Sequence, residues 1–302
     1  MTHDNPNKIQ VQRRAKKIEP DDKLSNHVFN IPAKKFANIL DNHKRCGCVE
    51  GHKNGVKVVT NYWLELIEGY VDLSPFTPFH REVLFAAISA YEQGVRVITF
   101  RTTLHSLTGG NQTRVRNDQF EAFKAAFDRL GSVRIKIDLA PLFKAYPKYA
   151  ANFKGNRDRA ELVGILLPLT YLETEINGQK NLTVKLLDES PLMTVAKLKK
   201  QLLTYDTAPL AISGQNNTPQ VITVKNFLLR RIELIKQRGL NSSILFDTLY
   251  KECGLADADN GKKRDTRKVI ADILNSFKAD GVIKNFEFER RGNAYRSIKI
   301  TT

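Results

Sequence analysis

A cluster of basic side chains near the C-terminal end of the chain is the feature best suited to chemistry. Five of them fall within seven residues: Lys262, Lys263, Arg264, Arg267 and Lys268. Ammonium and guanidinium groups attract phosphate, and arginine also pairs with the edge of guanine through two parallel hydrogen bonds. Asn275 follows in the same segment, and asparagine can pair with adenine in a similar way. These residue types together predict a surface that binds nucleic acid.

A helix over 262–279 is expected to position these side chains. Its predicted buried stripe consists of apolar residues at helical spacing, namely Ile270, Ile273, Leu274 and Phe277. At about 100° per residue, Arg264, Lys268 and Asn275 fall on the opposite face, together with Ala271. The basic residues crowd the N-terminal half of this helix, where the helix dipole also favours a phosphate.

A β-hairpin with a basic tip is predicted to follow this helix. Phe286 and Phe288 alternate with Glu287 and Glu289, and Lys299 separates two isoleucines, which is the period of a strand. The turn between the two runs reads Arg290, Arg291, Gly292 and Asn293. We expect the two arginines to contact a DNA backbone or a narrow groove, and the alternative is a solvated turn without DNA contact.

Two further helices are predicted before the basic helix. One covers 223–237 and ends at Gly239; the other covers 243–253, with Ser243 as its N-cap, and ends at Gly254. Three helices followed by a hairpin is the order of a winged helix-turn-helix, whose third helix enters the major groove. The alternative is a solvated helix that carries ordinary surface lysines.

The first half of the chain shows the same order of elements. Helices are predicted over 77–93, 102–107 and 111–130, and strands over 95–99, 133–139, 162–175 and 182–187. Gly94 and Gly109 correspond to Gly239 and Gly254, because 239 − 94 and 254 − 109 are both 145. The predicted fold class is therefore α+β, with two winged helix-turn-helix domains in tandem, joined by a helix and a linker.

Four segments are expected along the chain. Residues 1–26 form a basic, disordered arm; 27–189 form the first winged-helix domain; 190–218 form a connecting helix and linker; 219–302 form the DNA-binding domain. The connecting helix is predicted over 191–205, with Ser190 as its cap, and the linker over 209–219.

The third helix of the first unit is predicted to be a poorer DNA-reading surface. Its exposed face carries residues of nearly balanced charge, namely Arg114, Asp118, Glu121, Ala125 and Arg129. Carboxylates repel phosphates, so this unit is expected to position the protein or to dimerise more than to read bases. Arg114 is retained as a candidate DNA contact.

The composition supports an anionic partner. The 302 residues carry a net charge of +16 and have an isoelectric point near 9.7, which points to nucleic acid first. No run of about 18 apolar residues exists and the start lacks the apolar core of a signal peptide, so no membrane role is expected. Three cysteines without a secretion signal indicate a reducing compartment, and we expect a cytoplasmic protein.

Signatures of catalysis are scarce. The chain has no phosphate-binding loop of the form G-x-x-x-x-G-K-[ST], no H-E-x-x-H and no paired histidines that could hold the metal of a nicking enzyme. His43, Cys46, Cys48 and His52 carry metal-ligand side chains, but their spacing matches no zinc finger, and loop residues are the favoured interpretation. We expect no cofactor, no metal and no enzymatic activity.

Six segments between about 76 and 300 carry a further signal: TPFHREVLFAAISAYEQG, TLHSLTGGN, LLPLTYLETEINGQ, FLLRRIELIK, ILFDTLYKECG and ILNSFKADGVIKNF. In this order they resemble the plasmid replication initiator proteins of the tandem winged-helix, iteron-binding family. The resemblance implies binding to repeated sites in double-stranded origin DNA, help in opening the duplex, and recruitment of the host replication initiator and helicase. It also implies autorepression and a homodimer in equilibrium with the monomer. Residues 1–70 match nothing in the family.

A transcriptional regulator with two winged helices would show the same surface chemistry, and only the resemblance favours an initiator over it. An enzyme that nicks or transfers strands through a tyrosine is disfavoured, because the chain shows no metal constellation or basic catalytic cluster.

Overall fold

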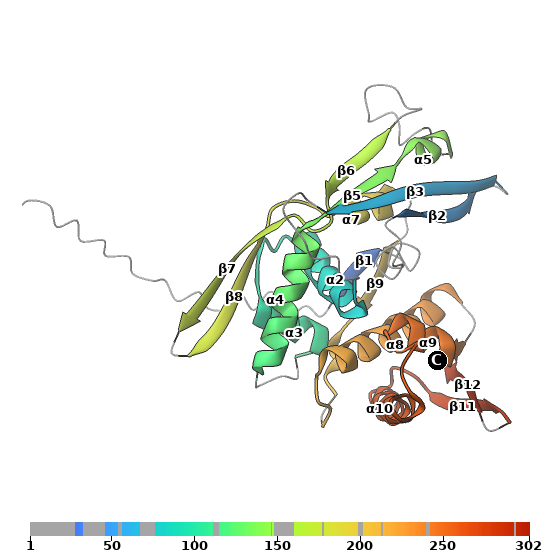
Figure 1. Ribbon diagram of the computed structural model, residues 1–302. Coiled ribbons are helices and arrows are strands. Elements are labelled where there is room, and N and C mark those ends of the chain that lie inside the picture. Colours follow the sequence, from blue (N-terminus) through green and yellow to red (C-terminus); the bar gives the residue numbers. More distant parts are fainter. Residues whose placement is uncertain are drawn as a thin grey trace, which may run out of the picture.

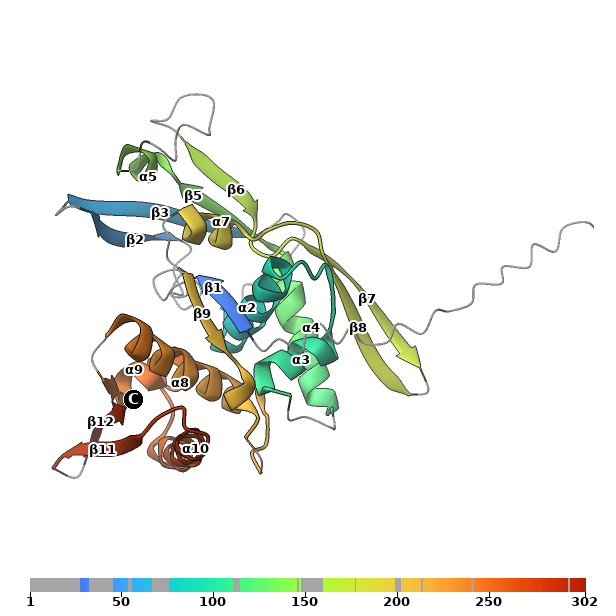
Figure 2. The same ribbon diagram turned by 180° about the vertical axis from the view of Figure 1, so that it is seen from behind.

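The structure is a computed structural model with a mixed α/β fold (Figure 1). It describes residues 76–110, 115–145, 147, 160–176, 178–198, 202–212, 214–239, 242–292 and 294–302, and the backbones of three strands between 28 and 66. The predicted arm at 1–26 lies outside these residues. The three described bodies are a first helical unit, a sheet inserted into it, and a second helical unit at the C-terminal end (Figures 1 and 2).

The first unit follows the predicted order of helix, strand, two helices and a hairpin. Its elements are α2 (Pro78–Glu92), β4 (Val97–Thr99), α3 (Phe100–Thr108), α4 (Asn117–Gly131), β7 (Leu169–Ile176) and β8 (Gln179–Leu186). The Thr77 hydroxyl accepts a bond from the His80 amide, and His80 Nδ1 accepts one from the Thr77 amide, so α2 begins where predicted. Helix α4 begins at Asn117, later than the predicted 111, and residues 111–114 lie outside the described ones.

Gly109 ends α3 in a place that only glycine fits. Its φ is +64°, in the left-handed region, and a Cβ there would lie 2.4 Å from the amide nitrogen of Ala211. The end of α3 therefore packs directly against the backbone that leads into the second unit.

A four-stranded sheet, called the inserted sheet here, combines two strands that precede α2 with two that lie between α4 and the hairpin of the first unit. Its order is β2-β3-β5-β6, from β2 (Cys46–Lys53), β3 (Val56–Leu66), β5 (Val133–Asp138) and β6 (Glu161–Ile165), with α5 (Ala140–Ala145) between β5 and β6. The strand predicted over 133–139 is β5, and it pairs with β3 and β6 in this sheet and not with the hairpin strands β7 and β8. Cys46, Cys48 and His52 lie in β2 and not in a loop, and their side chains are not described.

The single strand predicted over 162–175 is two strands in two sheets. Leu166 and Leu167 separate β6 from β7, and both are buried. The Leu166 amide donates to Val133 O and the Leu167 amide to Leu130 O, while Pro168 has no amide proton to continue a ladder. The chain therefore changes sheets at this point, and β7 pairs with β8 as the predicted hairpin.

The segment between the units differs from the prediction. Helix α7 (Pro191–Leu198) ends early, and β9 (Leu202–Asp206) pairs with β1 (Val28–Pro32) where the helix was expected to continue to 205. Burial in β9 alternates, with Leu203 and Tyr205 inside, which is the period of a strand. The Ser190 hydroxyl donates to Leu166 O, where a helix cap was predicted.

The described part of the predicted linker is packed. After the short 3-10 helix η3 (Ala208–Leu210), Ile212 and Asn217 are buried, and Gln119 Nε2 donates to the Asn217 carbonyl at 2.6 Å. These contacts replace the solvated loop expected over 209–219. The domain boundaries themselves remain predictions.

The second unit repeats the order of the first. It consists of α8 (Pro219–Arg238), β10 (Ser243–Leu245), α9 (Phe246–Glu252), α10 (Asn260–Ala279), β11 (Asn285–Arg291) and β12 (Ala294–Thr301). Its sheet order β10-β12-β11 matches β4-β8-β7 of the first unit. Ser243 does not cap a helix, because it lies in β10 opposite Lys299 and α9 starts three residues later.

The glycine correspondence predicted from the sequence has a structural counterpart. Gly94, Gly109, Gly239 and Gly254 all have a positive φ, between 57° and 83°, at or just after helix ends. The starts of β4 and β10, and those of α3 and α9, differ by the same 146 residues (243 − 97 and 246 − 100). The two units are thus repeats in element order and in helix termination.

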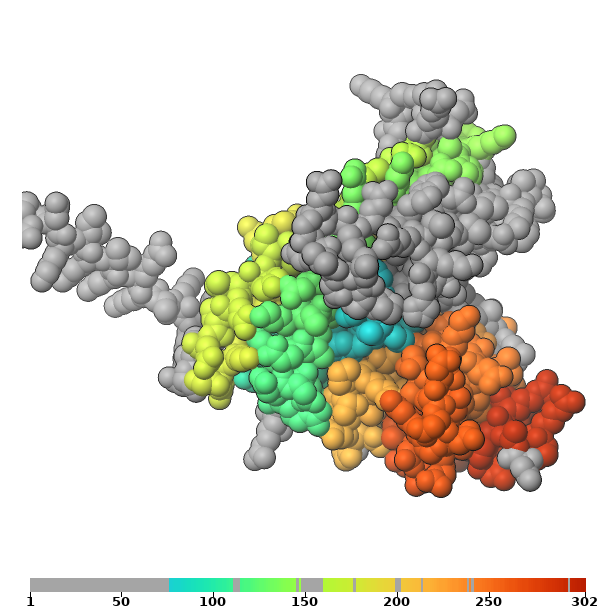
Figure 3. Space-filling view, viewed as in Figure 1, coloured from blue at the N-terminus to red at the C-terminus, as the bar shows by residue number. Residues whose placement is uncertain are grey.

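Helices α2 and α8 join the two units through buried ionic side chains. Glu82 accepts bonds from both Arg81 and Arg230, and Arg81 also binds the side chain and carbonyl of Glu252 in α9. Arg81 and Glu82 are fully buried. In the space-filling view the second unit lies directly against the surface of α2 (Figure 3).

Candidate nucleic-acid interface

Helix α10 has the amphipathic arrangement predicted for it. Its buried residues are Thr266, Ile270, Ile273, Leu274 and Phe277, and these pack into the core of the second unit. Asp259 caps its start, since the Asp259 carboxylate accepts the Lys262 amide at 2.7 Å. The Asp259 carboxylate therefore occupies the N-terminal end of α10, where the sequence suggested that the helix dipole would favour a DNA phosphate.

The exposed face of α10 carries the side chains best placed to meet DNA. Arg264, Lys268 and Asn275 are exposed on the side away from the core, as predicted, and Lys262 is exposed at the start. Asp265 lies 3.8 Å from Arg264 Nε and 3.5 Å from Lys268 Nζ. All three of these side chains are about two-thirds or more exposed, so the pairs are weak and leave both cations available to a phosphate or a base.

Lys263 and Arg267 are only half-exposed, because each is bound by neighbouring groups. Lys263 Nζ donates to Ala256 O at 2.8 Å and lies 5.7 Å from the centre of the Tyr250 ring. Arg267 donates to the Tyr250 hydroxyl at 3.0 Å, and its guanidinium carbon lies 4.9 Å from the centre of the Tyr295 ring. Both are therefore placed for backbone contacts at the edge of the interface more than for reading bases.

The hairpin places Arg290 against Tyr295, the tyrosine that Arg267 also contacts. The guanidinium carbon of Arg290 lies 4.2 Å from the centre of the Tyr295 ring, and Arg290 donates to the Tyr295 hydroxyl. Arg291 is exposed at the tip, and Asn293 lies outside the described residues. Helix α10 and this hairpin occupy the end of the molecule remote from the inserted sheet (Figure 1).

Sequence reasoning missed three residues of this surface. Tyr250 and Tyr295 hold the basic side chains, but a tyrosine in an amphipathic pattern carries no signal of that role. Arg296 is exposed because a bulge after Glu289 shifts the register, so that Glu289 pairs with Ser297 and Arg290 with Tyr295. No sequence pattern marks that bulge.

The corresponding helix of the first unit presents paired charges. Asp118 is bound by Arg116 at 2.6 Å, and Glu121 by Lys180 of the hairpin at 2.7 Å. Lys124 is bound by Glu173 at 2.6 Å. The hydrogen bond from Lys180 lowers the pKa of the Glu121 carboxyl, so this charge persists at neutral pH. Arg114 lies outside the described residues.

The buried ions between the units have shifted pKa values of structural origin. Burial alone would raise the pKa of Glu82. The charges and hydrogen bonds of Arg230 and Arg81 outweigh burial, so the pKa lies below its ordinary value. Glu82 in turn raises the pKa of Arg230 against the effect of burial. These groups have their hydrogen bonds inside the protein, and nothing in their geometry exposes them to a substrate.

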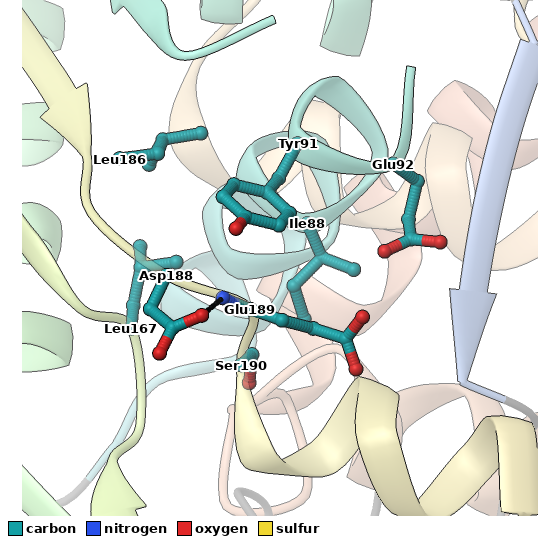
Figure 4. Close-up of a pocket in the computed structure, with 8 residues that line it drawn as sticks. All are labelled: Ile88, Tyr91, Glu92, Leu167, Leu186, Asp188, Glu189 and Ser190. Carbon is teal, nitrogen blue, oxygen red and sulfur yellow. Dashed lines mark hydrogen bonds between the residues drawn. The ribbon is translucent and has the colours of Figure 1, made fainter. Parts of the chain in front are cut away.

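A shallow hollow next to α2 offers no alternative site. It is lined by Ile88, Tyr91, Glu92, Leu167, Leu186, Asp188, Glu189 and Ser190 (Figure 4). Its carboxylates Glu92 and Glu189 are both bound by Lys197, at 2.8 Å and 2.5 Å. Over the described residues, no cluster of three metal-binding side chains occurs and no helix is long and apolar enough to cross a membrane.

Comparison with solved structures finds three similar chains, and two of them are described below. Neither a family model nor a curated protein matches the chain. Crystal structures of domains 2 and 3 of RctB are similar in structure: one, of selenomethionine derivatives, has a TM-score of 0.40 and 11% identity over 86% of this chain and 93% of that chain. The other has a TM-score of 0.38 and 9% identity over 86% and 92%. Likeness at this level carries no argument about function.

Proposed function

We propose that this chain is a sequence-specific DNA-binding protein built from two winged helix-turn-helix units. The observation that carries the proposal is the exposed face of α10, where Arg264, Lys268 and Asn275 point away from the core. The basic hairpin tip at Arg290 and Arg291 belongs to the same unit. Helix α10 would enter the major groove and the hairpin would contact the backbone beside it.

The biological role that we propose is initiation of plasmid replication. The protein would bind repeated origin sites, help to open the duplex, recruit the host replication initiator and helicase, and repress its own gene. It would work in the bacterial cytoplasm as a homodimer in equilibrium with its monomer, without a cofactor or catalytic site. The support for this role is the family resemblance of segments between 76 and 300 and the net charge of +16.

Two measurements test this role. We expect tandem repeats of about two helical turns, roughly 20 base pairs, next to the gene, and tight binding of the purified protein to one repeat. A circular DNA that carries only the gene, its flanking sequence and a selectable marker should replicate in a bacterial host. Tight binding to the flanking DNA without replication would instead assign the protein to transcriptional regulation.

A further inference from the structure

We propose that Arg267 and Arg290 bind one and the same DNA backbone phosphate, and that Tyr250 and Tyr295 position them for it. This inference rests on the proposed function and names a contact within it. Arg267 belongs to α10 and Arg290 to β11, yet their guanidinium carbons lie 4.9 Å and 4.2 Å from the centre of one ring, that of Tyr295. A single side chain therefore joins the reading helix to the hairpin.

The two arginines keep their charge available for an anion. Within the described part of the chain, no carboxylate lies in ion-pair distance of Arg267 or Arg290. Their partners are the neutral hydroxyls and rings of Tyr250 and Tyr295. An aromatic ring orients a guanidinium through its quadrupole without neutralising it, whereas a carboxylate would cancel the attraction to phosphate.

The tyrosine support is itself held rigidly. The Tyr295 ring contacts Phe246 of α9 at 6.0 Å and Phe288 of β11 at 5.9 Å between ring centres, both nearly edge to face. Tyr250 is buried and lies 5.6 Å from Phe246. A fixed ring removes much of the conformational freedom that an exposed arginine otherwise loses on binding.

The N–H donors that Arg267 and Arg290 do not use on the tyrosines indicate the kind of ligand that the pair binds. A guanidinium has five N–H donors, and the hydrogen bonds to the two tyrosine hydroxyls use one of them in Arg267 and one in Arg290. A phosphodiester offers two unesterified oxygens, which suits two guanidiniums that approach from a helix and a hairpin. The phosphate is expected on the backbone at the groove edge, between the base contacts of α10 and the hairpin tip.

The test is a double-variant cycle in the full-length protein on a random duplex of about 30 base pairs, roughly three helical turns. Binding is titrated at several salt concentrations for Arg267→Ala, Arg290→Ala and the double variant. Each single change should weaken binding about three- to tenfold and make the salt slope shallower by about 0.9, the value of one phosphate. The double variant should lose the same 0.9 and not twice that amount. Arg101→Ala, which removes an exposed charge in α3, serves as the matched control and should leave the slope unchanged.

The tyrosines are tested by substitutions that separate ring from hydroxyl. Tyr295→Leu should weaken binding about three- to tenfold, and Tyr295→Phe, which keeps the ring, by only about twofold. Tyr250→Phe removes only the acceptor of Arg267, and should have little further effect in the Arg267→Ala background. Near-ultraviolet circular dichroism and the melting temperature report whether each variant folds, and Tyr250→Phe keeps the test decisive if Tyr295→Leu does not fold.

Several results would overturn the inference. A double arginine variant that loses about 1.8 units of slope would show two separate phosphates. Unchanged affinity in folded Tyr295→Leu would remove the positioning role. A wild-type protein that binds no duplex at all would instead refute the proposed function.

Discussion

The two helical units share an order of elements but use their charges in opposite ways. On α4 of the first unit, Glu121 and Lys124 are paired with Lys180 and Glu173 of the adjoining hairpin. On α10 of the second unit, Arg267 is held against tyrosines instead. Ion pairs between exposed side chains add little stability, so their main consequence is that the charges on this face of α4 largely cancel and attract phosphate only weakly.

This contrast shows why the fold by itself does not identify a DNA-reading unit. Helices α4 and α10 occupy equivalent places in a repeated fold, but they differ in whether their basic side chains are available to bind phosphate. On α4 and at the junction, the ion-paired charges serve the protein's own structure. In the second unit, charges are presented outward on a rigid support, and the proposed function depends on that difference.

The largest expected effect is a loss of stability when the buried charge of Glu82 between the two units is removed. Glu82→Gln leaves Arg81 and Arg230 buried without a full counter-charge, so the free energy of unfolding should fall by about 3–5 kcal/mol. Urea unfolding measures this, with Glu233→Gln as the control, because Glu233 pairs with Lys236 near the surface. Equal losses for the two variants would contradict the distinction between buried and surface pairs.

The pH dependence of stability should also reveal the buried charge of Glu82. The pKa of Glu82 is lower in the folded protein than its ordinary value, so its stabilising contribution is present above the unfolded pKa. That contribution is lost as the pH falls through the folded pKa. Wild type should therefore lose stability in acid more steeply than Glu82→Gln, as measured by melting temperature across an acidic pH series.

A smaller effect is expected at the reading face. Arg264→Ala should weaken binding to an origin repeat by about 1–3 kcal/mol and binding to random DNA only slightly, if Arg264 contacts a base edge. Titrations on the repeat and on a scrambled duplex measure both. Equal weakening on the two duplexes would mean that Arg264 contacts only phosphate.

The hairpin tip is expected to act on both kinds of DNA alike. Changing Arg290 and Arg291 together to Ala should weaken binding to the repeat and to the scrambled duplex by similar factors. The salt slope should become shallower by about 1–2 units, because each phosphate that the protein no longer neutralises lowers it by about one unit. An unchanged slope on both duplexes would show that the hairpin does not touch DNA, and weaker binding to the repeat alone would indicate readout of groove shape.

The smallest effect should come from converting the first unit towards the second. Glu121→Gln with Glu173→Gln releases Lys180 and Lys124 from their partners. Affinity for random DNA should rise about two- to threefold, with a change in stability below about 1 kcal/mol. Gel-shift titrations at low salt measure the gain, and an unchanged affinity would mean that this face lies away from DNA.

Much of the helical framework was determined by the sequence itself. Thr77 and Pro78 fix the start of α2, and Gly109 and Gly239 fix helix ends, because capping and positive φ are local requirements. The outward face of α10 also followed from local periodicity, since residues at helical spacing share a face in any context. Arg264, Lys268 and Asn275 could therefore be placed from the sequence alone.

Tertiary structure decided where strands pair and which charges are available. Residues 162–175 look like one strand, but they divide between two sheets at Leu166 and Leu167, because pairing depends on distant partners. Residues 202–206 lie in a strand because β1 supplies its partner. The hairpin residues Lys180 and Glu173 that pair with α4, and the ring of Tyr295 against Arg267, likewise come from distant parts of the chain. Such contacts have no local pattern from which they could be predicted.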